Sequence, residues 1–375
     1  MILGNYKSKA STVNLNSSGI MLVAVLLLIA LVVYYYGINR ILGLPPGPPP
    51  LPIICNMLSF DWDIDKVLLN WKARYGPVFT MWLPNPMVVI GDHKVLQEHV
   101  ARNAIVYLAK RNPEQLMKVW FGGNYGLGFE ENDMVKEQRK FALKTLHEVG
   151  FNTPALEDAV HNVALEAVSR WRKRSNGAAV DVTDNIAKSV GNVIWKLIFG
   201  VDLEFDNEVV PKFRRMQQEF LPMIGGPLMM AFEMFPIVRK FDFLFGSHFA
   251  RLEALLKDAN KLMEEKIKIA ESSYNPDNEA GCYVDAFLQE VKRLEDAGKP
   301  IGNFLAEQLL ASASTIWGTG FDTTVNTTRL WCLELVNYPE VQRKLQKEID
   351  DVIGGRVIEP KQMDQRESVF DDQKQ

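Results

Sequence analysis

The sequence predicts a mainly helical protein with a small β region and an N-terminal transmembrane helix. Helical periodicity of apolar residues runs through most of the chain beyond residue 133, and two short strand-like runs lie near residue 80. An uncharged apolar stretch of about twenty residues lies near the N-terminus, long enough to cross a bilayer. The 375 residues suffice for one large domain or two. A net charge of -4 gives no basic bias, so we expect no nucleic-acid partner.

The N-terminal apolar stretch, residues 19–38, contains no charged residue and includes three consecutive tyrosines. Tyrosine rings prefer the membrane–water interface. A cleaved signal peptide is the alternative, but the run is long for one and no small-residue cleavage site follows it. We therefore expect an N-terminal tail over residues 1–18 and an uncleaved anchor over residues 19–38.

A proline-rich segment follows the expected anchor and contains six prolines within the eight residues Pro45 to Pro52. Proline at this density excludes a helix and forms a stiff, extended chain. The segment could serve as a ligand of a proline-binding domain. Its position directly after the anchor favours a hinge over residues 39–52 that holds the body away from the membrane.

The body reads as two short strands followed by many helices. We expect a helix over 61–75, strands over 78–83 and 87–90, a short helix from 93, and helices over 133–149, 154–172, 184–199, 209–221, 248–271, 283–296 and 304–336. Asp184 and Ser247 are the expected N-caps of two of these helices.

Two further stretches of the body need interpretation. Gly122 to Gly128 is glycine-rich, but no Lys-Ser/Thr pair follows and no strand–turn–helix unit surrounds it, so we exclude a phosphate loop. Residues 222–245 are rich in Met, Phe, Leu and Pro. This second stretch is either core or an adaptable apolar surface for a membrane or greasy ligands.

The long helix expected over residues 304–336 is interrupted by the polar sequence Thr-Gly-Phe-Asp-Thr-Thr at 319–324. A helical glycine costs about 1 kcal/mol relative to alanine, and a buried aspartate costs more unless it is paired. On a structural interpretation, Gly320 permits close helix packing while Thr323 and Thr324 bond back to the preceding turn. On a functional interpretation, these polar groups carry chemistry.

Cysteine and histidine usage is sparse. The three cysteines, Cys55, Cys282 and Cys332, suggest a reducing compartment without a disulfide framework. The sequence contains no CxxC or HExxH pairing, and its five histidines lack metal-ligand spacing.

Five stretches, in order along the chain, resemble the microsomal cytochrome P450 family of haem-thiolate monooxygenases. They are the proline-rich segment, Tyr75 to Thr80, Lys136 to Phe141, Gly320 to Thr324, and Tyr338 to Gln342. The second is similar to the family's first-strand signature, the third to the helix whose Arg pairs with a haem propionate, and the fourth to its oxygen-activating motif. The resemblance covers about Pro45 to Gly355 and implies the cytochrome P450 fold.

The resemblance implies roles for five residues. Arg139 would neutralise a haem propionate, and Gly320 and Thr324 would lie beside the cofactor. Thr323 would hold a water molecule or donate a proton during oxygen activation, with Asp322 as the acid behind it.

The resemblance also implies a haem cofactor and a monooxygenase that inserts one oxygen atom from O2 into a lipophilic small molecule. Electrons would come from NADPH through cytochrome P450 reductase. The loop 100–129 and the stretch 216–245 would line the substrate pocket. We expect a single anchor in the endoplasmic reticulum membrane and a cytosolic body.

Several departures from the family pattern matter. Val135 and Thr319 stand where the family usually has Trp and a small Ala or Gly. The sequence contains no FxxGxxxCxG loop to supply the axial cysteine, so we expect no metal ligand in this chain. We therefore expect an incomplete catalytic domain over residues 53–355 and a polar, disordered tail over residues 356–375. The alternative is a non-catalytic, membrane-anchored fragment that cannot bind haem through a thiolate.

Overall fold

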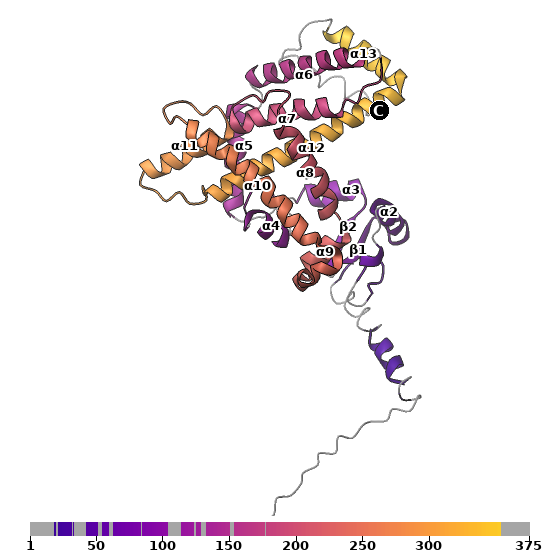
Figure 1. Ribbon diagram of the computed structural model, residues 1–375. Coiled ribbons are helices and arrows are strands. Elements are labelled where there is room, and N and C mark those ends of the chain that lie inside the picture. The colour runs from indigo at the N-terminus through magenta and orange to yellow at the C-terminus, as the bar shows by residue number, and fades with distance from the viewer. Residues whose placement is uncertain are drawn as a thin grey trace, which may run out of the picture. The chain divides into compact units, whose positions relative to one another are not determined.

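The computed structural model describes residues 19, 22–31, 33, 43–51, 55–59, 63–83, 85–103, 114–123, 125–128, 133–150, 154–176 and 178–353 (Figure 1). Within them the fold is mainly helical with one two-stranded sheet, as the sequence predicts. The chain divides into two compact units, Met1–Tyr107 and Leu108–Gln375.

The first unit is built on one β-hairpin. Its described elements are η1 (Met57–Ser59), α2 (Ile64–Tyr75), β1 (Val78–Leu83), β2 (Asn85–Ile90), α3 (His93–Val95) and the π-helical turn η2 (Leu96–Ala101). The strands pair antiparallel, with Val78 opposite Ile90. Phe79 of β1 is fully buried, and the ring of Trp71 on α2 meets it edge-on at 6.2 Å.

The proline-rich segment lies along β1 and does not stand free of it. The Thr80 N–H donates to the Pro46 carbonyl at 3.0 Å, and Pro48 is buried. A Cβ added to Gly47 would lie 1.8 Å from the Thr80 carbonyl oxygen, so only glycine allows this approach. The described part of the expected hinge is therefore packed against the sheet and hydrogen-bonded to it.

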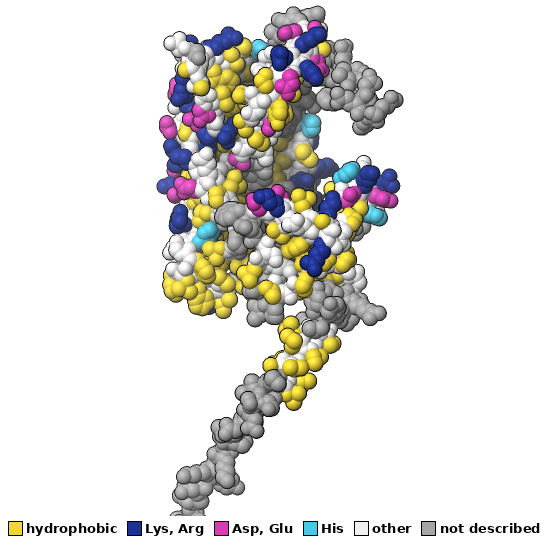
Figure 2. Space-filling model, turned by 90° about the vertical axis from the view of Figure 1, so that its right-hand side faces the viewer, with side chains coloured by type: hydrophobic (Ala, Val, Ile, Leu, Met, Phe, Trp, Pro, Cys, Tyr) yellow, Lys and Arg dark blue, Asp and Glu magenta, His cyan; other side chains and the backbone are white. Residues whose placement is uncertain are grey.

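The expected anchor is described only at residues 19, 22–31 and 33, all of which are helical. Its apolar side chains are exposed, from Leu22 (61%) to Val33 (64%), and they cover this helix in Figure 2. Among the residues that the structure describes, no helix has both the length and the apolar character needed to cross a membrane. The expected tails over 1–18 and 356–375 lie outside the described residues.

The second unit is a body of helices around one long central helix, α12 (Figure 1). Its elements are α4 (Glu114–Phe121), α5 (Asp133–Val149), α6 (Pro154–Ser175), α7 (Thr183–Phe199), α8 (Val209–Ile224), α9 (Pro227–Met234), η4 (Pro236–Phe245), α10 (His248–Ser273), α11 (Tyr283–Asp296), α12 (Ala306–Asn337) and α13 (Pro339–Ile353). Helices α7, α10 and α11 pack against α12, and the main core fills the space between them.

Close packing of α7 on its neighbours depends on Gly191. A Cβ at this position would lie 2.7 Å from a methyl group of Val210 on α8 and 3.3 Å from the Trp317 ring on α12. Because those distances are shorter than van der Waals contact, glycine allows three helices to converge here.

The prediction that Asp184 is the N-cap of α7 was wrong. The helix begins at Thr183, and the Asp181 carboxylate accepts the Thr183 N–H at 2.8 Å. Asp184 lies in the first turn and pairs with Arg214 of α8. Asp181 is the better acceptor because it lies just before the helix, where its carboxylate can accept the N–H group two residues ahead.

The predicted cap of α10 also needs correction. Ser247 adopts φ +56° and its hydroxyl makes no capping bond. The Asp242 carboxylate accepts the N–H groups of Phe249 and Ala250 instead, at 2.9 and 3.0 Å. A full negative charge beside the positive helix end makes Asp242 the better acceptor.

A second apolar cluster joins α4, α9 and α10, and it resolves the open interpretation of residues 222–245. Met229 and Phe232 of α9 are buried in this cluster. Phe243 and Leu244 of η4 are 71% and 66% exposed. The first half of the stretch is therefore core and the second half is apolar surface.

Candidate functional site

The rotation of α12 is fixed by two aromatic residues one turn apart. Trp317 and Phe321 are 2% and 1% exposed, and their rings stack at 5.1 Å. Trp317 also meets Trp195 of α7 edge-on at 5.5 Å. Because residues four apart share one helix face, this anchor directs Thr319 and Thr323 away from the core.

Three threonines spaced four residues apart form a ladder along that outward face. The hydroxyls of Thr315, Thr319 and Thr323 each donate to the carbonyl four residues earlier at 2.7 Å. The predicted back-bond of Thr323 is therefore confirmed. For Thr324 the structure supplies no support for the predicted back-bond: its recorded contact is through its carbonyl, which accepts the Thr328 hydroxyl at 2.8 Å. Each of these three hydroxyl groups donates its hydrogen to a backbone carbonyl, and its oxygen can still accept a hydrogen bond.

Beside this ladder lies an open, mostly apolar cavity of about 310 Å³ between α5, α7 and α12. Arg139 of α5 is the single charged side chain in its lining. The complete lining is Leu127, Arg139, Ala142, Leu143, Leu146, Ile194, Leu197, Thr315, Ile316, Thr319 and Gly320. The lining is therefore chemically suited to an apolar group that carries an anionic substituent.

Gly320 serves helix packing as well as the cavity. A Cβ added there would lie 3.1 Å from Cδ1 of Ile194 on α7, which is tighter than an ordinary contact. This short distance supports the structural interpretation, in which Gly320 permits close helix packing. Its backbone still forms part of the cavity wall.

The structure brings together some of the predicted site residues and leaves others beside them. Arg139 and Gly320 line one cavity, whereas Asp322, Thr323 and Thr324 follow within about one turn of α12 and are not part of its lining. The Asp322 carboxylate accepts the Asn326 amide at 3.1 Å.

The sequence analysis did not single out Thr315, although the repetition of threonine at every fourth residue was a readable signal for it. It included Leu127 only as part of the expected 100–129 loop. The described part of residues 216–245 contributes no side chain to this cavity, while Leu127 belongs to the expected 100–129 loop.

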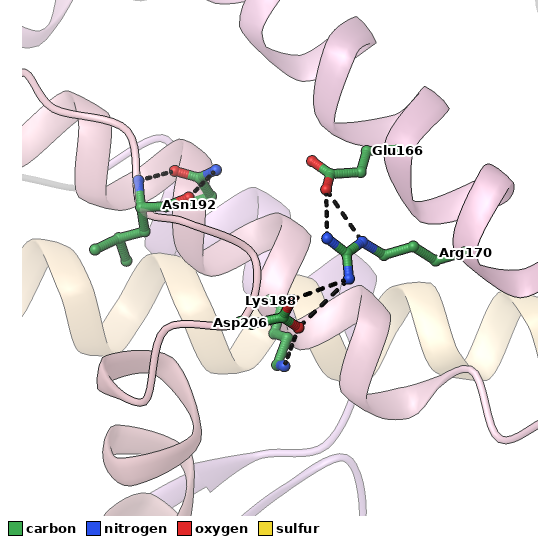
Figure 3. Close-up of polar contacts among 6 residues, drawn as sticks. Glu166, Arg170, Lys188, Asn192 and Asp206 are labelled. Atoms are coloured by element: carbon green, nitrogen blue, oxygen red, sulfur yellow. Dashed lines mark hydrogen bonds and ion pairs between the residues drawn. The ribbon is translucent and has the colours of Figure 1, made fainter.

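A second cavity, of about 460 Å³, lies between α6, α7 and the loop that follows α7. Figure 3 shows that its charged groups satisfy one another: Arg170 donates to Glu166 at 2.8 Å and to Asp206 at 3.4 Å, and Lys188 lies 3.8 Å from Asp206. The Arg170 guanidinium also covers the Phe205 ring at 4.0 Å. These exposed pairs hold a loop in place, so we assign this cavity a structural role.

The same loop is held by an amide side chain of α7. The Leu203 N–H donates to Asn192 Oδ1 at 2.8 Å, and Asn192 Nδ2 donates to the Leu203 carbonyl at 3.0 Å (Figure 3). One side chain thus satisfies both backbone groups of one loop residue.

The sequence profile described as Cytochrome P450 matches residues 45–369. The chain belongs to the cytochrome P450 family. The match includes α5 with Arg139 and the whole of α12, so the residues that line the cavity lie within the matched range.

Several curated relatives of the cytochrome P450 family resemble this chain. Cytochrome P450 2C41 of Canis lupus familiaris is 32% identical over 83% of this chain and 62% of its own length. Cytochrome P450 2A8 of Mesocricetus auratus is 31% identical over 92% of this chain and 69% of its own length. The probable cytochrome P450 CYP36A1 of Caenorhabditis elegans is 28% identical over 90% of this chain and 66% of its own length. The chain therefore spans about two thirds of the length of these relatives.

Cytochromes P450 imply a haem, and the cavity fits one side of it. Apolar side chains from three helices match the faces and edges of a macrocycle, and Arg139 matches a carboxylate. The described residues contain no group of three or more His, Cys, Asp or Glu side chains that could hold a metal ion.

None of the three cysteines lies in the lining of this cavity. Cys282 is completely buried at the start of α11, where burial raises the pKa of its thiol to about 12. Cys55 belongs to the first unit, and Cys332 lies on α12 three turns beyond Gly320. A thiolate ligand needs a deprotonated sulfur, so Cys282 is the least suited of the three.

Proposed function

We propose that this protein acts as a haem-dependent monooxygenase on lipophilic small molecules, with electrons delivered from NADPH by cytochrome P450 reductase. Its family membership supports the reaction class. The observation that carries the proposal is the cavity in which Arg139, Thr319 and Gly320 come together.

Arg139 would hold the haem through a charge-assisted hydrogen bond to a propionate. Thr319 and Gly320 would lie against the macrocycle, with Leu143 and Leu146 of α5 along its apolar edge. When bound, haem supplies the reduction of O2 that this chain's side chains cannot perform.

Thr323 would manage the proton required by that chemistry. Its hydroxyl donates to the Thr319 carbonyl, so its oxygen is oriented to accept a hydrogen bond from a water molecule. In this role Thr323 holds and orients water, and direct donation would first require its own back-bond to break. Asp322, half-exposed and bonded to Asn326, would exchange protons with solvent and resupply that water.

A second candidate is a non-catalytic, membrane-anchored protein that binds no haem through a thiolate. The observation that favours it is the position of the three cysteines, none of which lines the cavity. The two candidates differ in iron ligation, which absorbance reports directly.

The deciding experiment is the absorbance spectrum of the 375-residue chain, expressed with haem supplied, after reduction and addition of carbon monoxide. A red-shifted thiolate band supports the monooxygenase, and Cys282→Ser and Cys332→Ser then identify the ligand. Absence of any haem band supports the second candidate.

We further propose attachment to the endoplasmic reticulum membrane through residues 19–38, with a cytosolic body. The exposed apolar helix within residues 22–33 supports this anchor. The apolar surface of η4 supports a second contact: Ile237, Phe243 and Leu244 are exposed beside the cations Arg239 and Lys240. Apolar side chains gather in this way at the lower edge of the helical body in Figure 2.

Vesicle flotation separates the two contacts. Deleting residues 1–38 should release most of the chain, and adding Phe243→Asp with Leu244→Asp should release the remainder. Full membrane association after the deletion would shift the attachment to η4, and loss caused by the η4 variants alone would argue against the anchor.

A further inference from the structure

The glycine-rich segment 122–128, which carries no phosphate-loop pattern, is fastened to α12 by one buried amide. The Gly126 N–H donates to Gln308 Oε1 at 3.1 Å, and Gln308 Nε2 donates to the Gly126 carbonyl at 3.2 Å. Gln308 is 0% exposed, and its Nε2 also donates to Ser312 Oγ at 2.9 Å. Both backbone groups of one loop residue are therefore satisfied by one side chain that is itself held by its helix.

The conformation of Gly126 makes this fastening specific. Its φ of +103° is reached readily only by glycine. A Cβ at this position would lie 3.2 Å from Thr315 Oγ1 and 3.7 Å from the Ala311 Cβ. Gly126 thus rests directly on the face of α12 that continues into the threonine ladder.

The residue after this contact reaches the cavity. Leu127 is half-buried, packs against the main core and lines the same cavity as Arg139 and Thr319. Because Gly126 is bonded on both of its backbone groups, the position of Leu127 is set by Gln308.

We propose that Leu127 forms one wall of the haem cavity, where it contacts the apolar edge of the bound cofactor, and that Gln308 is the positioning residue that places it. This inference rests on the proposed function for the identity of the ligand. The fastening itself does not depend on haem.

The first test measures hydrogen exchange in the haem-free chain. Gln308→Met keeps the side-chain volume but removes the bonds, so exchange of the Gly126 amide should accelerate about tenfold, the worth of one hydrogen bond. Gly128→Ala is the matched control, because its added Cβ would meet no atom within 4 Å. Unchanged exchange in Gln308→Met would overturn the fastening.

The second test is a double-mutant cycle on haemin affinity, measured by absorbance in imidazole, which supplies axial ligation. Gln308→Met and Leu127→Ala should each weaken haemin about tenfold, and the double variant should be no weaker than either, because both act through one contact. Gly126→Ala should weaken haemin like Gln308→Met, and Gly128→Ala should not.

The outcomes separate the two claims. Additive losses, or no loss in Leu127→Ala, would overturn the positioning role of Gln308 while leaving haem binding intact. No haemin binding by the unmodified chain would overturn the proposed function and the wall together, and the exchange rates would still decide the fastening.

Discussion

At the scale of the residue, the hydrogen bonds that the threonine hydroxyls donate determine which polar groups α12 presents on its outward face. A threonine that back-bonds to its own helix is locked in one rotamer and presents an acceptor to the outside. Thr319 and Thr323 therefore offer fixed oxygen atoms on a face that Trp317 and Phe321 hold away from the core.

Thr323→Ala should uncouple oxygen consumption from product formation in the haem-loaded protein, lowering product per O2 by about tenfold or more. Thr323→Ser should retain coupling because it keeps the accepting oxygen. Thr328→Ala is the control, since it removes the same kind of back-bond one turn further along. If the Ala and Ser variants form the same amount of product per O2 consumed, Thr323 has no role in proton delivery. Oxygen uptake and product are measured together.

Cys282 should be the most inert thiol of the chain. With a pKa of about 12, its thiolate fraction at pH 7 is about three orders of magnitude below that of an ordinary cysteine. Iodoacetamide should therefore label the half-exposed Cys332 first and Cys282 only after unfolding. Mass spectrometry of timed digests checks the order, and early labelling of Cys282 would contradict its burial.

At the scale of the element, short helices are held by their neighbours more than by their own sequence. Helix α4 has eight residues, too few to be stable alone. At the start of α4, the Glu233 carboxylate of α9 accepts the N–H groups of Gln115 and Leu116. Near the end of α4, the Asn260 amide of α10 donates to the Trp120 carbonyl. Both ends of α4 are thus closed by groups more than 100 residues away in sequence.

Glu233→Ala should lower the free energy of unfolding by about 1–2 kcal/mol, the usual worth of a helix cap. Glu233→Gln should recover part of that loss because it keeps one acceptor oxygen. Glu219→Ala, on the exposed side of α8, is the control. Urea unfolding gives the magnitudes, and exchange of the Leu116 amide localises the change. Equal stability of Glu233→Ala and Glu219→Ala would contradict the cap.

The elements that could be predicted from sequence are those whose apolar period is long. Helices α5 and α11 match their expected bounds, and α12 differs by two residues at its start and by one at its end. The eight-residue helices α4 and α9 could not be predicted, because two turns are too short for the helical repeat of apolar residues to be recognised in the sequence. The motif in α12 could be found from its local chemistry. The bond between Gln308 and Gly126 joins residues 182 positions apart, which no local pattern reports.

At the scale of the whole molecule, the pH dependence of stability depends on ionised carboxylates, including Glu290 within α11 and Asp181 at the start of α7. Hydrogen bonds from Arg293 hold the pKa of Glu290 below its ordinary range, and hydrogen bonds from Thr183 do the same for Asp181. A carboxylate with a lowered folded-state pKa stabilises the fold above its unfolded pKa. That stabilisation is lost as pH falls through the lower, folded pKa.

Stability should therefore decline as pH falls below about 4.3, the ordinary value for glutamate. Glu290→Gln and Asp181→Asn should each flatten that decline and leave the profile above pH 6 parallel to that of the unmodified chain. Urea midpoints across the pH range check this. An unchanged acid slope in both variants would assign the decline to other carboxylates.

The two amide side chains that grip loop backbones have a consequence for sequence change. Asn192 and Gln308 bind only the N–H and C=O groups that every residue except proline offers, so the attachment ignores the side chain of Leu203 and constrains Gly126 only through its φ. Loops tethered this way can accumulate substitutions without coming loose. Among folded members of a library that randomises Leu127 and Leu203, both backbone attachments should therefore persist, and ligand preference should change with Leu127, which lines the cavity, and not with Leu203.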